Sequence, residues 1–459
     1  MKNYTIFIFR RDLRLIDNKG LIYAIKNYEN IVPIFIFTPE QVTEKNKYKS
    51  DNAIQFMIES LKELDNNLKK YESKLHLFYG DNIKILSKII KKINVTSIIF
   101  NMDYTPYAIK RDKQINELCS SKGNNIECVM IEDYLLKKVG SFNKKNKEPY
   151  HIFTPFRNNA FTHKIDKPIK IKIKNLVKVN NLGEYGYIKY EINDNILVNG
   201  GRQNGIKLLN QIKNQKKYNK TRNIVNIETT KLSAYIKFGC ISIREVYWKI
   251  INVLGKKNIL LSQIFWREFY YYIVYYYPEV LKGKNFNIKY DKIKWNWNKS
   301  NFDKWCKGET GYPIVDAGMR QLNVTGFMHN RSRLITANFL NRMLGMDWRI
   351  GEQYYAIKLS DYDPSVNNGN WQWIGSTGVD PKPYFQRLFN PWLQSKRFDK
   401  DATYIKTWIP ELQNIPANEL HQWDQYYKNY DLKKINYYKP IVDYKKARKS
   451  SISMYRAVL

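Results

Sequence analysis

The sequence contains few cysteines and histidines, with four of the former and five of the latter among 459 residues. No two cysteines form a C-x-x-C pair, and no two histidines have the spacing of metal ligands. We therefore expect neither a metal site nor a disulfide framework, and the few cysteines fit a reducing compartment. A Walker A loop is missing, and GGRQNG at residues 200–205 does not fit G-x-G-x-x-G after a strand. These absences argue against metal-dependent hydrolysis and against dehydrogenase chemistry.

Long apolar runs are missing as well. The most apolar stretch, residues 259–281, is interrupted by Arg267, Glu268 and Glu279, so it is too charged to span a membrane. Residues 1–12 have the pattern of a strand followed by charge, which is unlike a signal peptide. We therefore expect a protein that is neither secreted nor embedded in a membrane.

Acidic residues are scarce relative to basic ones. Lys and Arg number 77 against 42 Asp and Glu, a formal charge of +35, which favours a polyanionic partner such as DNA or RNA. The many Lys, Asn and Ile residues also fit the codon usage of an AT-rich genome, so charge alone leaves nucleic-acid binding open. The hydrophobic content of 43%, with 36 Tyr and 11 Trp, predicts a globular chain of two or three domains.

Hydrophobic periodicity divides the chain into three parts. Short runs rich in β-branched residues predict buried parallel strands at residues 5–9, 31–37, 75–79, 97–100 and 126–131. Helical spacing between them is clearest for Ile54, Met57, Leu61, Leu64 and Leu68. We therefore predict a doubly wound α/β parallel-sheet domain over residues 1–135, a loosely packed connector over 136–200, and an all-α domain over 201–459. In the last part, the apolar residues over 334–344 make one broad stripe with helical spacing.

A series of motifs runs in order along almost the whole chain. The motifs are FRRDLR at residues 9–14, YHIFTPF at 150–156, TTKLS at 229–233, WREFY at 266–270, TGYPIVDA at 310–317, GFMHNR at 326–331, DYD at 361–363 and NNGNWQW at 367–373. Together they resemble the photolyase/cryptochrome family, and most closely its class I cyclobutane pyrimidine dimer photolyases. The resemblance implies an N-terminal antenna domain and a C-terminal helical domain that holds FAD in a folded form.

The resemblance also implies which side chains hold the FAD. Hydroxyl and backbone N–H groups around Thr229, Thr230 and Ser233 would bind the diphosphate. Arg333 and Asp361 match an ion pair against the flavin, and Asn367 matches the position opposite flavin N5, where a neutral amide favours the reduced anionic flavin. The full expected set is Tyr218, Thr229, Thr230, Lys231, Leu232, Ser233, Arg267, Asn330, Arg333, Asp361, Asp363 and Asn367.

A second implied set serves catalysis and the lesion. Trp371, Trp348 and Trp295 match the family's electron-transfer chain from the flavin to the surface, and Asn367 and Gln263 are the other catalytic candidates. Trp266 and Trp373 match the family's aromatic walls around a flipped-out lesion. Such walls would hold the lesion by stacking, which is worth about 1–3 kcal/mol per base. The expected lesion contacts are Trp266, Trp373, Gln263, Tyr270, Asn330, Arg331 and Leu334.

Gln263 departs from the family pattern. Enzymes that repair cyclobutane dimers carry Glu there, whereas Gln resembles the (6-4) photolyases and animal cryptochromes; Gln can hydrogen-bond but cannot share a proton. The (6-4) photolyases, however, have a histidine pair where this chain has Asn330 and Leu334, and their chemistry needs a proton donor. A cryptochrome-type photoreceptor is the other alternative, which the short segment after residue 412 disfavours.

The resemblance implies a light-driven carbon–carbon lyase. Photoexcited reduced FAD would give an electron to a flipped-out cyclobutane pyrimidine dimer, with UV-damaged DNA as partner. NMDYTPY at residues 101–107 resembles enzymes whose antenna is a deazaflavin, while a folate or an empty antenna site stays open. We expect a monomer that works with the DNA in the cytoplasm or nucleus.

Overall fold

The computed structural model describes residues 2–459, and its N-terminal part is built on a single parallel sheet. The strands are β1 (Tyr4–Phe9), β2 (Ile31–Phe37), β3 (His76–Tyr79), β4 (Val95–Asn101) and β5 (Glu127–Ile131). Every adjacent pair is parallel and the order is β3-β2-β1-β4-β5. The predicted doubly wound sheet is therefore confirmed, with the strand order reversing beside β1.

Helices cover both faces of the sheet, and successive side chains of each strand point to opposite faces. Phe7 and Phe35 point into the cluster that includes the apolar residues of α1 and α3, while Ile6 and Ile34 point into the cluster under α4 and α5. The helices of this part are α1 (Lys19–Asn27), α2 (Pro39–Val42), α3 (Asp51–Lys69), α4 (Asn82–Lys92) and α5 (Pro106–Cys119). β2 is buried at every position and is apolar along its whole length, whereas the edge strand β5 begins with an exposed glutamate.

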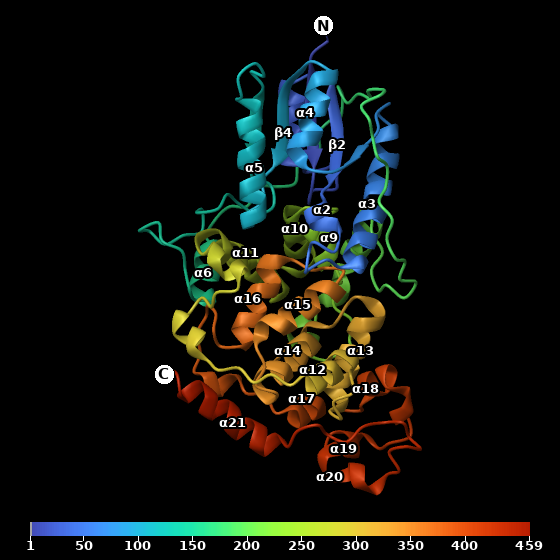
Figure 1. Ribbon diagram of the computed structural model, residues 1–459, viewed down its shortest axis with the longest axis vertical. Helices are drawn as coiled ribbons and strands as arrows, with labels where there is room; N and C mark the ends of the chain where they lie inside the picture. The colour runs from blue at the N-terminus through green and yellow to red at the C-terminus, as the bar shows by residue number, and fades with distance from the viewer. Residues whose placement is uncertain (1) are drawn as a thin grey trace.

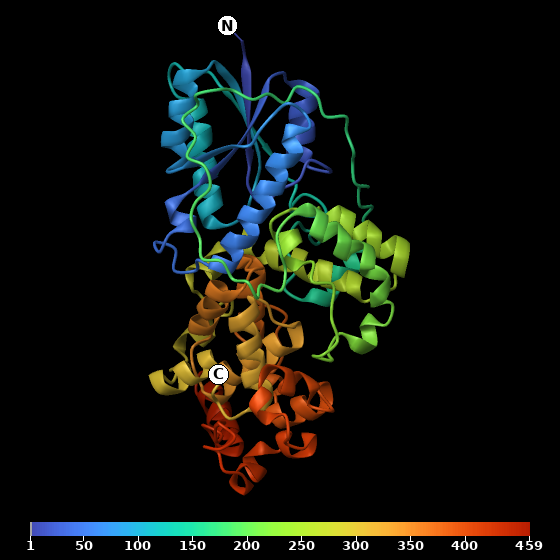
Figure 2. The ribbon, with the colours of Figure 1, turned by 90° about the vertical axis from the view of Figure 1, so that its right-hand side faces the viewer.

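One segment of the connector over residues 136–200 packs against the α/β domain. Figure 2 shows much of the connector as a thin green loop that runs along the α/β domain. Leu176 forms a parallel bridge with Ile31, and the backbone N–H of Tyr185 donates to the carbonyl of Leu77 at 2.8 Å. In this segment half-buried apolar residues alternate with exposed lysines and face the domain, while most of residues 164–200 stay exposed or half-buried.

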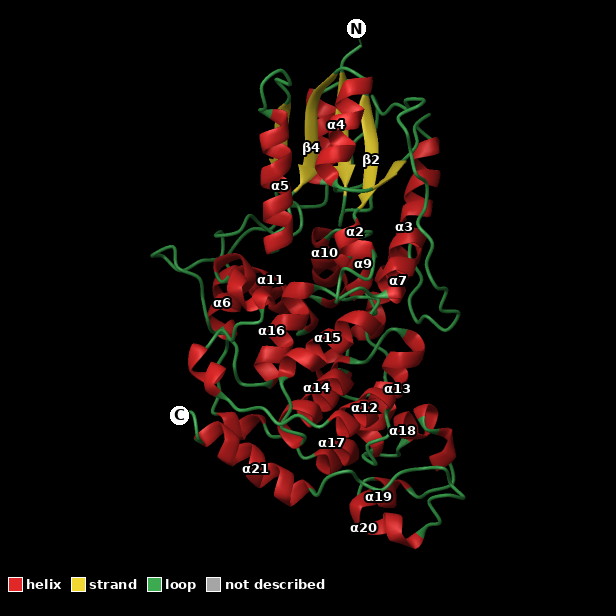
Figure 3. Ribbon diagram, in the orientation of Figure 1, coloured by secondary structure: helices red, strands yellow, loops and turns green. Residues whose placement is uncertain are grey.

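The rest of the chain is helical, as predicted, and Figure 3 shows strands only at the N-terminal end. The helices are α6 (Phe153–Ala160), α7 (Arg202–Asn210), α8 (Tyr218–Thr221), α9 (Ser233–Lys237), α10 (Ile243–Leu254), α11 (Leu260–Tyr276), α12 (Lys299–Lys307), α13 (Pro313–Thr325), α14 (Asn330–Asn338), α15 (Trp348–Lys358), α16 (Pro364–Ile374), α17 (Pro391–Phe398), α18 (Thr403–Trp408), α19 (Ala417–Leu420), α20 (Trp423–Tyr426) and α21 (Tyr444–Arg456). Within residues 2–459, no helix has the length and apolar character needed to cross a membrane.

One apolar stripe spans two kinds of helical turn. The apolar stripe over residues 334–344 begins in α14 and continues as a π-helical turn, Phe339–Met343. Asn341 and Arg342 are fully buried in this turn and bond to backbone carbonyls, at 2.9 Å and 2.7 Å respectively. Periodicity alone could not reveal the wider turn, because the apolar residues keep nearly the same spacing.

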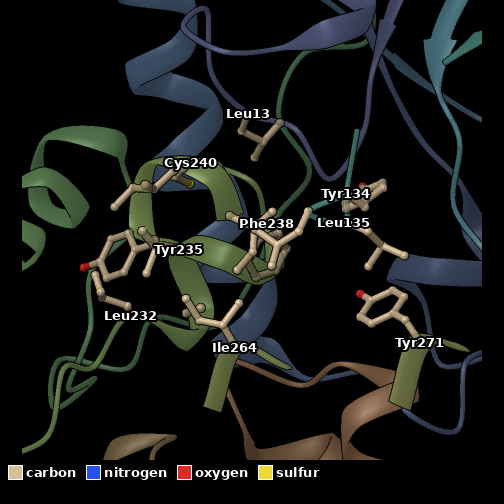
Figure 4. Close-up of a cluster of buried hydrophobic side chains, with 14 of the residues drawn as sticks. Leu13, Tyr134, Leu135, Leu232, Tyr235, Phe238, Cys240, Ile264 and Tyr271 are labelled. Atoms are coloured by element: carbon tan, nitrogen blue, oxygen red, sulfur yellow. The ribbon is translucent and has the colours of Figure 1, made fainter. Parts of the chain in front are cut away.

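The two parts of the molecule share a buried interface. At this interface the carboxyl ends of the strands face the helical part (Figure 1). Figure 4 shows Leu13 and Tyr134 of the α/β part in one cluster with Phe238, which follows α9. Arg244 of α10 is fully buried and forms ion pairs with Asp17 at 2.9 Å and with Asp133 at 2.7 Å. Apolar packing and buried charge pairs thus fix the helical part against the end of the sheet.

Candidate functional site

A cavity of about 520 Å³ lies in the helical part. Helices α9, α11, α14 and α16 contribute most of its wall, together with the loops before α9 and before α16. Every residue that the sequence predicts for the cofactor or the lesion lines this cavity. They are Tyr218, Thr229, Thr230, Lys231, Leu232, Ser233, Gln263, Trp266, Arg267, Tyr270, Asn330, Arg331, Arg333, Leu334, Asp361, Asp363, Asn367, Trp371 and Trp373.

Helical geometry explains why residues that are spread along the sequence meet here. Side chains three and four positions apart lie on the same face of a helix. The face of α11 toward the cavity carries Gln263, Trp266, Arg267 and Tyr270. The same spacing brings in two further sets: Asn330, Arg333, Leu334 and Ala337 of α14, and Asn367, Asn370, Trp371 and Ile374 of α16.

The segment before α9 differs in detail from the expectation. The hydroxyl of Ser233 donates to Asp361 at 2.6 Å, so it is not free to donate to a diphosphate. Lys231 has a positive φ of 52° and forms an ion pair with Glu228. Thr229 and Thr230 line the cavity, and their hydroxyls stay the predicted phosphate ligands.

Asp361 holds the centre of the cavity wall. One of its oxygens, Oδ2, accepts hydrogen bonds from Arg333 at 2.9 Å and from Ser233, so the predicted ion pair forms. The other oxygen is buried and has no hydrogen-bond partner within residues 2–459, and the same holds for the indole N–H of Trp371. Buried polar atoms are nearly always paired, so an unpaired acceptor and an unpaired donor in one cavity fit a bound polar cofactor such as FAD.

Asp363 has structural contacts in addition to its predicted role at the flavin. Its Oδ1 accepts the backbone N–H groups of Ser365 and Val366 and thereby caps α16. Its Oδ2 accepts from the hydroxyl of Tyr271 at 2.5 Å and pairs with Arg11. Burial opposes ionisation of Asp363, but the charges of Arg11 and Arg267 and the hydrogen bonds to the carboxyl together hold its pKa below the usual range.

The amide of Asn367 has a fixed orientation. Its NH₂ group donates to the backbone carbonyl of Glu352 at 3.0 Å, and its amide oxygen accepts no hydrogen bond within residues 2–459. An amide oxygen can accept a hydrogen bond but cannot donate one. This position therefore suits a ligand N–H, as the reduced flavin presents at N5.

Two aromatic side chains form walls of the cavity and are themselves supported from behind. Trp266 stacks on Phe153 with ring centroids 3.7 Å apart and an interplanar angle of 10°. The guanidinium of Arg387 lies 4.0 Å from the ring of Trp373, whose indole N–H donates to Asp380 at 3.3 Å. The sequence motif around Phe153 was recognisable, but its role behind Trp266 was not, because the two residues are far apart in the chain.

Basic side chains gather near Arg331. Its guanidinium lies over the ring of Phe398 at 4.4 Å and donates to Asn223 at 2.8 Å. Burial, followed by the charges of Arg222 and Arg397, lowers the pKa of Arg331 to about 10. Uncompensated positive charge of this kind suits phosphate, and sequence reasoning missed the contribution of Arg222 and Asn223.

His329 does not supply the missing proton donor. Its Nδ1 accepts the backbone N–H of Arg331 at 3.0 Å and so caps α14. Burial, with the nearby charges of Arg331 and Arg333, lowers the pKa of the imidazole to about 4. The ring is therefore neutral at physiological pH, and it lies outside the cavity lining.

The expected electron-transfer tryptophans lie at different depths. Trp371 lines the cavity, whereas Trp348 is fully buried outside it, with its indole N–H donating to Asn285 at 2.9 Å. Trp295 is half-buried and meets the ring of Tyr455 edge-on at 6.1 Å. Their order from the cavity toward the surface fits the predicted chain.

A second cavity of about 460 Å³ lies at the carboxyl ends of β1 and β2, where doubly wound sheets bind ligands. The segment that resembles deazaflavin enzymes contributes Asp103, Thr105, Pro106, Tyr107 and Arg111 to its lining. Lys237 and Tyr362 line both cavities and so form part of the wall between them. Burial, and then the charge of Arg11, lowers the pKa of Lys237 to about 7.

Comparisons with known proteins agree with this geometry. The family model for DNA photolyase matches residues 5–171, and the model for the FAD binding domain of DNA photolyase matches residues 260–457. The deoxyribodipyrimidine photo-lyase of Escherichia coli is 31% identical, with 98% of each chain covered. Further relatives are also named deoxyribodipyrimidine photo-lyase, which confirms the expectation of a light-driven lyase.

Solved structures show the same architecture. An archaeal photolyase from Sulfolobus tokodaii, which holds two FAD molecules, superposes with a TM-score of 0.87 at 38% identity, covering 99% of this chain and 100% of the other. A cryptochrome from Synechocystis superposes with a TM-score of 0.89 at 25% identity, covering 99% of each chain. The fold is therefore common to repair enzymes and cryptochromes. The motifs, the cavity and these similarities together establish that the chain belongs to the photolyase/cryptochrome family and that its cofactor is FAD.

Proposed function

We propose that the protein repairs cyclobutane pyrimidine dimers in DNA in a light-driven reaction. The observation that carries the proposal is a single cavity in which an amide oxygen set for a flavin N–H meets two aromatic walls and a basic edge. Such a cavity accommodates a polar cofactor and a flipped-out pyrimidine dimer at the same time.

The side chains of this chain divide the work. Thr229 and Thr230 bind the diphosphate, and the Arg333–Asp361 pair lies against the flavin. Arg331 binds a backbone phosphate, and Trp266 and Trp373 hold the flipped dimer by stacking. When bound, reduced FAD supplies one electron after it absorbs light.

Gln263 lines the same cavity and favours a second candidate function, the repair of (6-4) photoproducts. That reaction needs a proton donor near the lesion. Asn330 and Leu334 stand where the donor pair is found in those enzymes, and His329 has a pKa of about 4 and lies outside the cavity lining. The chemistry of this pocket therefore supports the cyclobutane dimer better.

We propose in addition that the second cavity binds a light-harvesting chromophore. It lies at the carboxyl ends of the strands and shares Lys237 and Tyr362 with the first cavity, so two pigments would be close neighbours. Its lining includes Arg10 and Arg111, each of which has one buried guanidinium nitrogen without a hydrogen-bond partner within residues 2–459, and these suit an anionic group such as the phosphate of a flavin or deazaflavin.

Repair under blue light tests the main proposal. The reduced protein is mixed with one oligonucleotide that carries a cyclobutane thymine dimer and with another that carries a (6-4) photoproduct, each with a dark control. We expect light-dependent restoration of the first alone. Restoration of the second alone would identify a (6-4) enzyme. Repair of neither, by protein whose flavin is bound and photoreducible, would leave the photoreceptor.

The Trp266→Ala variant serves as the matched control for lesion recognition. It removes one aromatic wall and leaves the Arg333–Asp361 pair intact. We expect normal FAD content and weaker binding of the dimer by about 1–3 kcal/mol. Equal loss of binding to undamaged DNA would contradict the assigned role.

A further inference from the structure

Trp305 of α12 lies behind the flavin cavity and has no role in the expected electron-transfer chain. It is fully buried, and its ring meets that of Trp371 edge-on at a centroid distance of 6.4 Å. Tyr355 bridges the pair, with its ring 4.8 Å from Trp371 and 6.1 Å from Trp305, nearly parallel to the latter. A continuous series of aromatic contacts thus leads from the cavity wall to the buried side of α12.

The contact continues to the surface. The ring of Phe302, on the same helix, stacks on Trp305 at 6.0 Å, and the ring of Trp297 lies 5.6 Å from Phe302. Trp297 precedes α12 and is 61% exposed. The residues Trp371, Trp305, Phe302 and Trp297, here called the α12 branch, therefore join the cavity to solvent.

The tyrosines beside the α12 branch are poor stopping points for an oxidising charge. A phenol must lose its proton when it is oxidised, and it needs a base to receive that proton. Burial raises the pKa of Tyr355 and Tyr354. The hydroxyl of Tyr355 meets the carbonyl of Arg333 at 3.1 Å, and that of Tyr354 meets the amide of Asn323 at 2.7 Å, and neither partner is a base.

The tryptophans meet the opposite conditions. An oxidised indole can persist as a radical cation while its N–H stays in place, as for Trp305, whose indole N–H donates to the carbonyl of Thr336 at 3.0 Å. At Trp297 the exposed indole can release its proton to water. Loss of that proton leaves a neutral radical at the surface and prevents return of the electron from the flavin.

We propose that the α12 branch is a second electron supply to the flavin, which diverges from the expected chain at Trp371. The inference rests on the proposed photochemistry of the bound FAD. One electron passes from Trp371 to the photoexcited oxidised flavin, Trp305 reduces Trp371, and Trp297 reduces Trp305 across the ring of Phe302. Trp297 then gives its N–H proton to water, and an external thiol restores it by supplying one electron and one proton.

The expected chain ends less favourably. Its surface member, Trp295, is half-buried against Tyr455, whereas Trp297 is 61% exposed. Because release of the indole proton requires water, the α12 branch offers the faster terminal step. The two endpoints are two residues apart in sequence, so they form a natural matched pair for substitution.

Flash excitation of the FAD-loaded, oxidised protein tests the branch. The measured quantity is the yield and lifetime of the neutral tryptophan radical in the unaltered protein, W295F, W297F and the double variant. We expect a long-lived radical in W295F, a reduced yield in W297F, and loss of the long-lived radical in the double variant. Trp305→Phe, with its folding checked by Tm, reproduces W297F.

A second readout locates the radical chemically and does not depend on its yield or lifetime. A nitroxide that couples to tryptophan radicals is present during illumination of W295F, and peptide mass spectrometry then locates the adduct. Label on Trp297 supports the branch, and its absence, or complete loss of the radical in W295F alone, would overturn it. If the unaltered protein forms no radical under light, the proposed photochemistry fails together with the branch.

Discussion

Arg11, in the loop after β1, forms a buried ion pair with Asp363, which caps the helix that carries Asn367 and Trp371. The two residues are 352 positions apart in the sequence. Arg11 also pairs with Asp103 at 3.2 Å beside the second cavity. One arginine of the FRRDLR motif therefore fixes the start of a wall of the flavin cavity and contacts the edge of the other cavity.

The Arg11–Asp363 pair should be essential for stability. Asp363→Asn keeps an oxygen that can cap α16 but removes the charge, and we expect it to lower the free energy of unfolding by about 3 kcal/mol. Asp363→Ala also removes the cap and should cost about 1 kcal/mol more. Urea unfolding at constant m-value measures both variants. Equal stability of Asp363→Asn and the unaltered protein would show that the pair contributes nothing.

Glu352 predicts a pH dependence of stability. Burial raises the pKa of its carboxyl to about 7, while the unfolded chain ionises near the ordinary value of 4.5. Between these values the folded state binds more protons than the unfolded state, so this group stabilises the fold at low pH, and that contribution decreases as pH rises toward 7.

The Glu352→Gln variant isolates this effect, because its amide oxygen still accepts from Asn368, whose side chain donates to Glu352 at 3.1 Å. The stability difference between variant and unaltered protein should grow with pH from about 4.5 to 7, by roughly 1.4 kcal/mol per pH unit at most. Thermal melting across this range measures it. A constant difference would mean that the carboxyl of Glu352 has the same pKa in the folded and the unfolded protein.

Much of the fold could be read from the sequence. The run at residues 31–37 matches β2 residue for residue, because a strand buried on both faces is apolar at every position. The π turn at Phe339–Met343 could not be read, since it preserves the apolar spacing. The contact of one connector segment with the domain, such as the bridge between Leu176 and Ile31, could not be predicted because many lysines mask the apolar side that faces the domain.

The site shows a similar division. Trp266 and Asn367 were predicted because each lies in a motif that the family shares. The contacts that orient them were not predictable, since Phe153 and the carbonyl of Glu352 come from distant segments and the latter involves only backbone. Long-range pairs of this kind leave no periodic pattern in one sequence.

Asn367→Asp should weaken the reduced state of the flavin. A carboxylate at this position places a negative charge beside the anionic reduced flavin, and like charges a few ångströms apart repel by a few kcal/mol at an effective dielectric constant of about 20. The midpoint potential measured by spectroelectrochemistry should therefore become more negative. Asn370→Asp adds the same charge to the same helix face, and an equal shift there would mean that the contact of Asn367 is not special.

Phe153 should act on the lesion without touching it. Its stacked ring holds Trp266 in place, and such aromatic pairs are worth about 0.5–1.5 kcal/mol. Phe153→Leu should weaken binding of dimer-containing DNA by this amount while binding of undamaged DNA is unchanged. Combined with Trp266→Ala, the substitution should have no further effect on dimer binding. Additive losses in the double variant would show that Phe153 acts independently of Trp266.

Gln263→Glu tests whether the unusual amide limits repair. A carboxyl at this place can both hydrogen-bond the dimer and share a proton with it, whereas the amide can only hydrogen-bond. If the dimer is the substrate, the substitution should raise the repair yield per absorbed photon by roughly the value of one good hydrogen bond, about 0.5–1.5 kcal/mol, or twofold to tenfold.

The Gln263→Glu gain should also depend on pH, because only the protonated carboxyl can donate to the lesion. It should be present at low pH and decline as the pH rises above the pKa of the new carboxyl, while the unaltered protein shows no such decline. Gln263→Leu, which removes the polar group, should lower the yield at every pH. If Glu lowers dimer repair and Gln is required for activity on the (6-4) photoproduct, the amide is an adaptation to that second lesion and the proposed substrate is wrong.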